Sequence, residues 1–256
     1  MKFFSMIQIE LKKLRHSHIV WILLIPVVLM WLPSIFNAGV NFHMEAEGIS
    51  PENNFLVQGY LGIAWFMYPA SLVICTVLLT QTERTNRGIL KMLALPVRPA
   101  QLCLAKFVVL LLLSCLQMAM MTIMYYISAA IATKTQSYGF IQPLLMVLRE
   151  AVPVYVLSIP MTALYWMIAV CVQTPIFSVG MGLATIVPSV LIINTKIWPA
   201  YPPSYPMMYM STELGRLATH MEYTPFGWLC CLAVGVVVTV LCLVLACTCY
   251  GRSERR

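Results

Sequence analysis

Long uncharged runs dominate the pattern of hydrophobic and polar positions along this chain. About 20 consecutive apolar residues cross the hydrocarbon core of a bilayer as one helix. Pro175 falls inside the longest uncharged run and predicts a break there, because proline cannot continue a helix. The runs without Asp, Glu, Lys or Arg are Ile19–Met44, Asn53–Thr82, Phe107–Thr133, Ala151–Thr195 and Tyr223–Gly251.

This pattern predicts an all-α polytopic membrane protein whose whole length, 1–256, forms a single transmembrane domain. Composition argues against the alternative, a soluble protein with a large core. Hydrophobic residues make up 61% and charged residues 10%, against about 45–50% and 25% in typical soluble domains. The six expected membrane helices cover about 18–37, 57–80, 104–132, 151–172, 176–194 and 225–249.

The basic residues predict the orientation of these six helices. Lys and Arg are enriched in the cytoplasmic loops of membrane proteins. The N-terminus, the segment between the second and third helices, and the C-terminal tail together hold twelve basic residues, whereas the opposite loops hold four. We therefore expect both termini in the cytoplasm of a multi-pass plasma-membrane protein.

Few residues suggest covalent chemistry. The chain has no Asp, no His-Glu-x-x-His motif and no phosphate-binding loop, and its four His lack ligand spacing. Nine cysteines fall in the helices or at the cytoplasmic face, which favours packing, although Cys247 and Cys249 could be acylated or bind metal. We expect no catalytic residue, no metal, no cofactor in this chain and no nucleic-acid partner. The predicted helix centres hold no Glu, Lys or Arg, which argues against an ion-coupled carrier.

The N-terminal residues predict an amphipathic helix at the inner surface of the membrane. Phe3, Phe4, Ile7, Leu11 and Leu14 recur at helical spacing on one side. Basic residues fill much of the other side, as is typical of a helix lying in the lipid headgroup layer. Ile7, Glu10, Leu11 and Leu14 are its candidate functional positions.

The segment between the second and third helices carries an apolar stretch inside a charged frame. Glu83 and Arg87 lie one helical turn apart and can pair. Gly88 permits a break before the apolar residues, and Pro96 ends them. Such a stretch needs a cover, which is either the membrane surface or a partner protein. Its apolar members are Ile89, Leu90, Leu93 and Leu95.

These two elements, in a six-helix chain of about this length, resemble the permeases of ABC-2 type transporters. The similar parts run from Glu83 to Leu-Pro-Val-Arg98 and from Glu10 to Ser17, with a departure from the pattern at Arg98-Pro99. The resemblance implies a separate ATPase subunit that binds ATP and Mg, and a second permease in a homo- or heterodimer. It also implies that the apolar segment docks on the ATPase, through Glu83, Arg87, Gly88, Leu93, Pro96 and Arg98.

The last outer loop, Thr195–Thr224, is rich in Pro, Met and aromatic residues. Its prolines predict an extended, stiff segment. One interpretation is an aromatic belt at the lipid boundary; another is an exposed surface that contacts an amphiphilic, often cationic peptide. Glu213 and Glu222 would favour a cation. The candidate substrate contacts are Trp198, Tyr201, Tyr205 and Tyr209, with Met121 in a Met-rich part of the third helix, where packing is the other interpretation.

Within the family, a short permease with such a loop resembles the lantibiotic-immunity permeases of nisin, epidermin and mutacin producers. The resemblance implies removal of lantibiotic-like peptides from the bacterial plasma membrane. The alternatives are an ABC-2 exporter of another lipophilic drug or lipid, and a non-transport scaffold or intramembrane enzyme.

Overall fold

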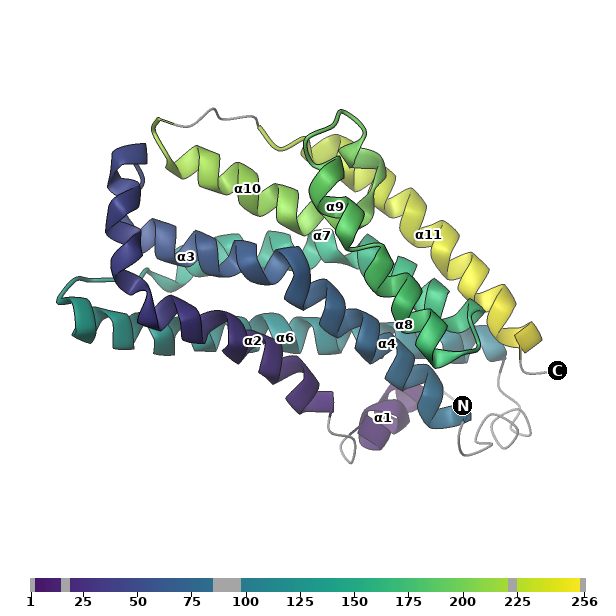
Figure 1. Cartoon of the computed structure of the whole chain (residues 1–256). Helices are drawn as coiled ribbons and strands as arrows, with labels where there is room; N and C mark the ends of the chain where they lie inside the picture. The colour runs from purple at the N-terminus through teal and green to yellow at the C-terminus, as the bar shows by residue number, and fades with distance from the viewer. Residues whose placement is uncertain (1–2, 15–18, 85–97, 221–224, 254–256) are drawn as a thin grey trace.

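The computed structural model describes residues 3–14, 19–84, 98–220 and 225–253, and every regular element in these ranges is a helix (Figure 1). The elements are α1 (Phe3–Leu14), α2 (Ile19–Phe36), η1 (Ala38–Glu47), α3 (Pro51–Gly62), η2 (Ile63–Met67), α4 (Tyr68–Arg84), α6 (Pro99–Gln136), α7 (Leu144–Cys171), α8 (Pro175–Ala184), α9 (Val187–Ile192), η3 (Trp198–Ala200), η4 (Pro202–Ser204), α10 (Tyr205–Leu217) and α11 (Trp228–Ser253).

Six stretches of helix are long and apolar enough to cross a membrane, which confirms the predicted all-α polytopic architecture. The second of them runs through α3, η2 and α4, with a π-helical turn in the middle. The fourth and fifth are separated at Pro175, as predicted. The six stretches are Ile19–Phe36, Pro51–Gln81, Pro99–Gln136, Leu144–Cys171, Pro175–Ile192 and Trp228–Tyr250.

Two of these helices, which start at Pro51 and Pro99, begin earlier than the uncharged runs suggested, and proline explains the starts. Pro51, Pro99 and Pro175 each occupy the first turn of a helix, where the missing N–H costs nothing and the fixed φ is already helical. α7 also starts early, directly after Pro143. As a result, Glu150 lies inside a helix rather than in a loop, and Lys106 lies in the second turn of α6 rather than at the very start of a helix.

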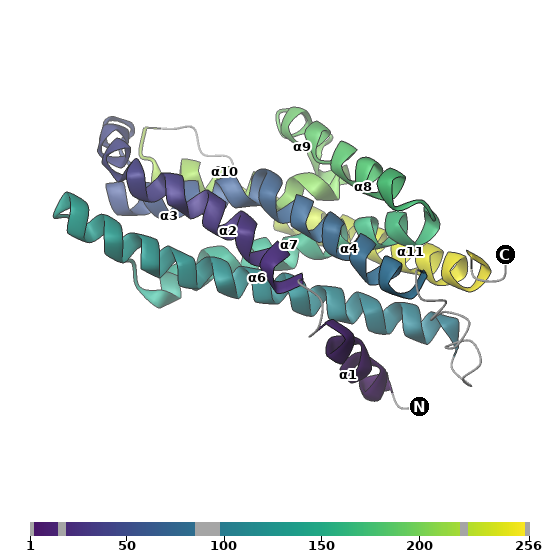
Figure 2. The same ribbon diagram turned by 60° about the horizontal axis from the view of Figure 1, so that its bottom comes forward.

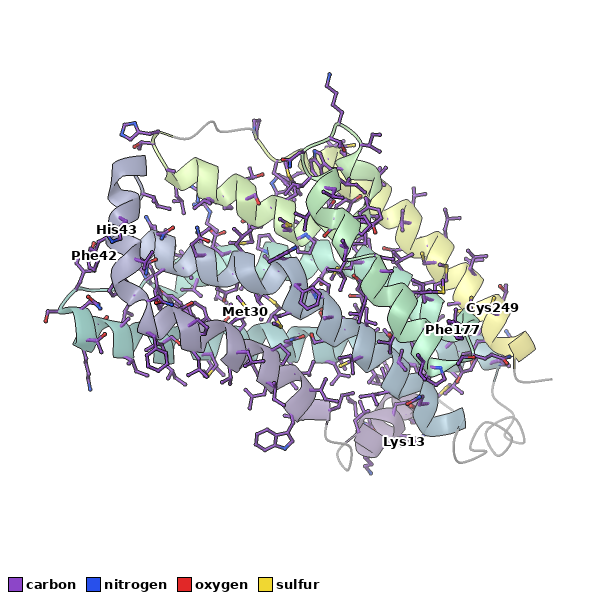
Figure 3. The ribbon with its side chains drawn as sticks, in the orientation of Figure 1. Lys13, Met30, Phe42, His43, Phe177 and Cys249 are labelled. Carbon is purple, nitrogen blue, oxygen red and sulfur yellow. The ribbon has the colours of Figure 1, made fainter. Side chains whose placement is uncertain are left out.

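Both termini lie at one end of the bundle, in agreement with an even number of spans (Figure 1). α1 lies at this end, together with the last turns of α4 and the first turns of α6, and Figure 2 shows the same arrangement from below. Among labelled side chains, Lys13 and Cys249 lie at this end, whereas Phe42 and His43 lie at the opposite end (Figure 3). The charge asymmetry of the sequence assigns the end with the termini to the cytoplasm.

α7 is the central helix of the bundle and packs against α4, α6, α10 and α11. Glycines allow two of the closest helix contacts. A Cβ on Gly59 would lie 2.4 Å from the Trp31 ring, and one on Gly182 would lie 2.6 Å from Val73 Cγ1. All nine cysteines are free thiols, as expected for a chain without a disulfide framework.

Candidate functional site

A buried ion pair fixes α1 to the cytoplasmic end of the bundle. Lys106 Nζ, in the second turn of α6, lies 2.7 Å from Glu10 Oε2, and both side chains are almost fully buried. Lys13 Nζ lies 2.6 Å from the other carboxylate oxygen of Glu10, and the Lys13 side chain is at the protein surface. Lys106 also donates a hydrogen bond to the Leu79 carbonyl at 3.3 Å. One lysine thus joins α1, α4 and α6.

This ion pair determines which face of α1 meets the protein. Met6, Glu10 and Leu14 are buried, at a spacing of four residues. Phe4 is fully on the outside and Leu11 is exposed, while Ile7 is half-buried. Glu10 was expected to be a functional position of this interfacial helix, but its burial was not predicted. The exposed apolar residues still suit the headgroup layer.

The predicted docking segment connects the same elements that Lys106 joins. Glu83 lies within the last turn of α4, and Arg98 is the exposed residue directly before α6. Arg87, Gly88, Leu93 and Pro96 lie outside the described residues. The segment therefore links the end of α4 to the start of α6. These two helices are also joined near their cytoplasmic ends by the contacts of Lys106.

Residues 198–217 form a packed, largely helical cap instead of the predicted extended surface. Two short 3-10 turns lead into α10, which lies along α3 and α7. The Tyr201 hydroxyl donates to the Thr185 carbonyl at 2.5 Å, and the Tyr205 hydroxyl donates to the Pro199 carbonyl. The prolines thus begin short helices, because their fixed φ is compatible with the first turn of a helix.

The cap buries two of the four aromatic residues that were expected to meet a substrate and partly covers the other two. Tyr205 and Tyr209 are buried, whereas Trp198 and Tyr201 are half-buried. Trp198 lies 5.4 Å from the Phe226 ring, and Phe226 contacts both Tyr209 and Trp228. This cluster matches the belt interpretation of the loop.

Met121 is also buried, inside the bundle. Its sulfur accepts a hydrogen bond of 3.0 Å from the Trp31 indole N–H. Packing is therefore its role in this conformation.

A second charged cluster lies at the outer end, where the sequence suggested exposed acids. Glu213 Oε2 accepts a bond of 2.6 Å from Arg216 Nε, and Arg216 Nη2 lies 3.9 Å from the buried Glu150. Burial lowers the pKa of the Arg216 guanidinium, but the Glu213 bond and the nearby charges of Glu213 and Glu150 together outweigh it and raise the pKa above its ordinary value. Glu213 is largely buried and is not a free attractant for cations, contrary to expectation. Glu222 lies outside the described residues.

The middle of the bundle contains a polar seam without ions. The Tyr68 hydroxyl meets the Ser114 and Ser158 hydroxyls, and Ser71 donates to Gln117 at 2.8 Å. These bonds join α4, α6 and α7 within the spans. Each group is neutral, so the seam orders the helices without the cost of a buried charge.

Sequence reasoning missed Glu10, Lys106 and Glu150 as structural centres, although a local signal was present. Each is flanked by apolar residues four positions before and after it, so each lies on an apolar stripe of its helix. A charge in that place must be buried or must interrupt the stripe. The flanking pairs are Met6 and Leu14, Leu102 and Leu110, and Met146 and Val154.

Comparison with known proteins gives one family. The family described as "ABC-2 family transporter protein" matches residues 6–193, which include almost all of α1 and the chain through α9. No significant match was found among the curated proteins or among the solved structures that were compared. The match covers well over half of the chain and, with six apolar helices, indicates a multi-pass protein of the plasma membrane. The chain therefore belongs to the ABC-2 family of transporter membrane proteins.

Proposed function

We propose that this chain is the permease subunit of an ATP-driven bacterial exporter and that a separate ATPase, with ATP and Mg, drives it through the segment around Leu93. The single observation that carries this proposal is the Glu10–Lys106 pair with its bond to Leu79. A movement of the segment caused by the ATPase is passed to α1, α4 and α6 together, because the cytoplasmic ends of these helices are joined at Lys106. A second permease, identical or different, completes the pore in this proposal.

Coupling is tested by Leu93→Asp in the full chain, co-expressed with an ABC ATPase that co-purifies with the wild-type chain. An unpaired charge buried in an interface costs several kcal/mol, roughly 3 or more, so co-purification of the ATPase should be lost. Lys12→Asp is the control, because it changes charge at an exposed position of α1. Equal recovery of ATPase with both variants would contradict the docking role of Leu93.

For the substrate, we propose lantibiotic-like peptides removed from the outer leaflet. The support is the aromatic cap, in which half-buried Trp198 and Tyr201 border the outer end of α8 and α9. The electrostatic argument for a cationic peptide is weaker than expected, because Glu213 is bonded to Arg216. Export of another lipophilic drug or lipid is the second candidate, favoured by the neutral seam along Tyr68, Ser114 and Ser158.

The two substrates are separated by resistance profiles. The permease and its ATPase are expressed in a sensitive bacterium, and growth inhibition is measured with nisin-type lantibiotics and with uncharged lipophilic drugs. Protection against the peptides alone supports the first candidate, and protection against the drugs alone supports the second. Cells that express the Leu93→Asp variant together with the ATPase give the level of growth inhibition in the absence of transport.

A further inference from the structure

An open pocket of about 660 Å³ lies at the outer end of the bundle, between the start of α7 and the end of α10. Two arginines and five apolar residues line it, with no carboxylate in the lining. We call it the outer basic pocket. Its residues are Pro143, Leu145, Met146, Leu148, Arg149, Arg216 and Leu217.

The two arginines of the outer basic pocket have different roles. Arg216 is held from behind by Glu213 and Glu150, which offset much of its charge but fix the direction of its guanidinium. A guanidinium has five N–H donors, so donors remain for a ligand. Arg149 is exposed, and its side chain makes no hydrogen bond or ion pair within the described part of the chain. Arg149 therefore supplies the exposed positive charge of the pocket.

The length of α7 is consistent with a pocket near the depth of the lipid phosphates. From Glu150 to Cys171, α7 continues for about 33 Å at 1.5 Å per residue, which closely matches a hydrocarbon core of about 30 Å. The backbone carbonyl of Arg149 also accepts a bond of 3.3 Å from Tyr209, whose ring lies 5.5 Å from that of Trp228. Trp and Tyr prefer this boundary.

An apolar track leads from the pocket toward the membrane centre. Leu148, Val152 and Val156 are exposed at intervals of four residues and so follow one face of α7. Leu145, at the mouth, is 82% exposed. The cations and the track together fit a molecule with an anionic head and a long apolar tail.

We propose that the outer basic pocket binds an anionic phospholipid of the outer leaflet. Its phosphate lies against Arg149 and Arg216, and one acyl chain lies along Leu148, Val152 and Val156. Phosphate and guanidinium are well matched, because parallel N–H donors can contact two oxygens. This site goes beyond the proposed export function and does not depend on it.

The test measures lipid binding by the purified full chain in detergent, without an ATPase. Phosphatidylglycerol and phosphatidylcholine are titrated separately, and bound lipid is counted by native mass spectrometry. The wild type should prefer phosphatidylglycerol. Arg149→Gln should weaken that binding about tenfold, as expected for loss of one charged contact, and should leave phosphatidylcholine unchanged. Lys134→Gln, an exposed cation near the end of α6 outside the pocket, should behave as wild type.

Two further arms decide the outcome. Val152→Trp fills the track from an exposed position and should also weaken phosphatidylglycerol binding. Glycerol phosphate, which has the head but no tail, should compete only weakly; competition as strong as that of the lipid would overturn the lipid assignment. Wild-type affinity for phosphatidylglycerol in both Arg149→Gln and Val152→Trp would reject the site.

Discussion

Buried charges carry much of the specificity of this molecule at the scale of single residues. Glu10, Lys106 and Glu150 are each less than about a tenth exposed in a bundle whose buried residues are mostly apolar. A buried charge is tolerated when an opposite charge and hydrogen bonds compensate for its lost hydration. Lys106 meets this condition through Glu10 and the Leu79 carbonyl. Glu150 meets it only in part, because Tyr209 bonds to its Oε2 while Arg216 lies 3.9 Å from its Oε1, which accepts no hydrogen bond within the described part of the chain.

We predict that Lys106→Met destabilises the docking of α1. Glu10 would keep only Lys13, which is 38% exposed, as its partner. Loss of a buried partner costs roughly 3 kcal/mol, so the thermal midpoint should fall and trypsin should cut at Lys12 and Lys13 more rapidly. Lys12→Arg is the control, because Lys12 is exposed and arginine keeps the trypsin site. Unchanged proteolysis of the Lys106 variant would show that the ion pair does not hold α1.

A second prediction compares two aromatic residues of the cap. Tyr205 is fully buried and its hydroxyl is bonded to Pro199, whereas Trp198 is half-buried. Tyr205→Ala should cost about 3–5 kcal/mol and lower the thermal midpoint more than Trp198→Ala. If Trp198→Ala reduces resistance while the complex assembles normally, a substrate role for Trp198 is supported. A larger loss of stability in the Trp198 variant would contradict the packing described for the cap.

At the scale of elements, the uncharged runs were enough to predict the six spans, because hydrocarbon leaves little choice but apolar helix. They were not enough to locate helix ends, since α6 and α7 continue through Lys106 and Glu150. The conformation of residues 198–217 was predicted wrongly. Closely spaced prolines fit both an extended segment and the first turns of short helices, and only packing on α7 decides between them.

Helix contact through glycine gives a prediction at the same scale. Gly182→Ala places a methyl group 2.6 Å from Val73 Cγ1, so α8 and α4 must separate. Such overpacking costs about 1–3 kcal/mol, which should lower the thermal midpoint. Gly180→Ala, in the same helix, has no atom within 4 Å of the new methyl group and should gain about 0.5–1 kcal/mol from helix propensity. Equal shifts in the two variants would rule out close packing at Gly182.

At the scale of the whole molecule, both termini lie at the end that also holds the bases of α4 and α6 (Figure 1). The distribution of Lys and Arg could be read from the sequence and gives the same result. The sequence could not show that the outer acids Glu150 and Glu213 turn inward toward Arg216, because that depends on α10 folding back along α7.

The orientation predicts how single cysteines react in a variant without the native ones. Lys196→Cys and Lys134→Cys lie at exposed outer positions and should be labelled by a membrane-impermeant maleimide on intact cells. Arg98→Cys, exposed before α6, should be labelled only after permeabilisation. Labelling of Arg98→Cys on intact cells would invert the orientation.

The Glu10–Lys106 pair also has a consequence for the order of events during synthesis. The two residues are 96 positions apart, and a ribosome adds about 5–20 residues per second. Glu10 therefore emerges roughly 5 to 20 seconds before its partner. During that interval α1 can reach only the lipid headgroups, with Lys13 beside its carboxylate. Its final position is set when α6 enters the bilayer, so a nascent chain arrested before Lys106 should leave α1 undocked although α2 is already inserted.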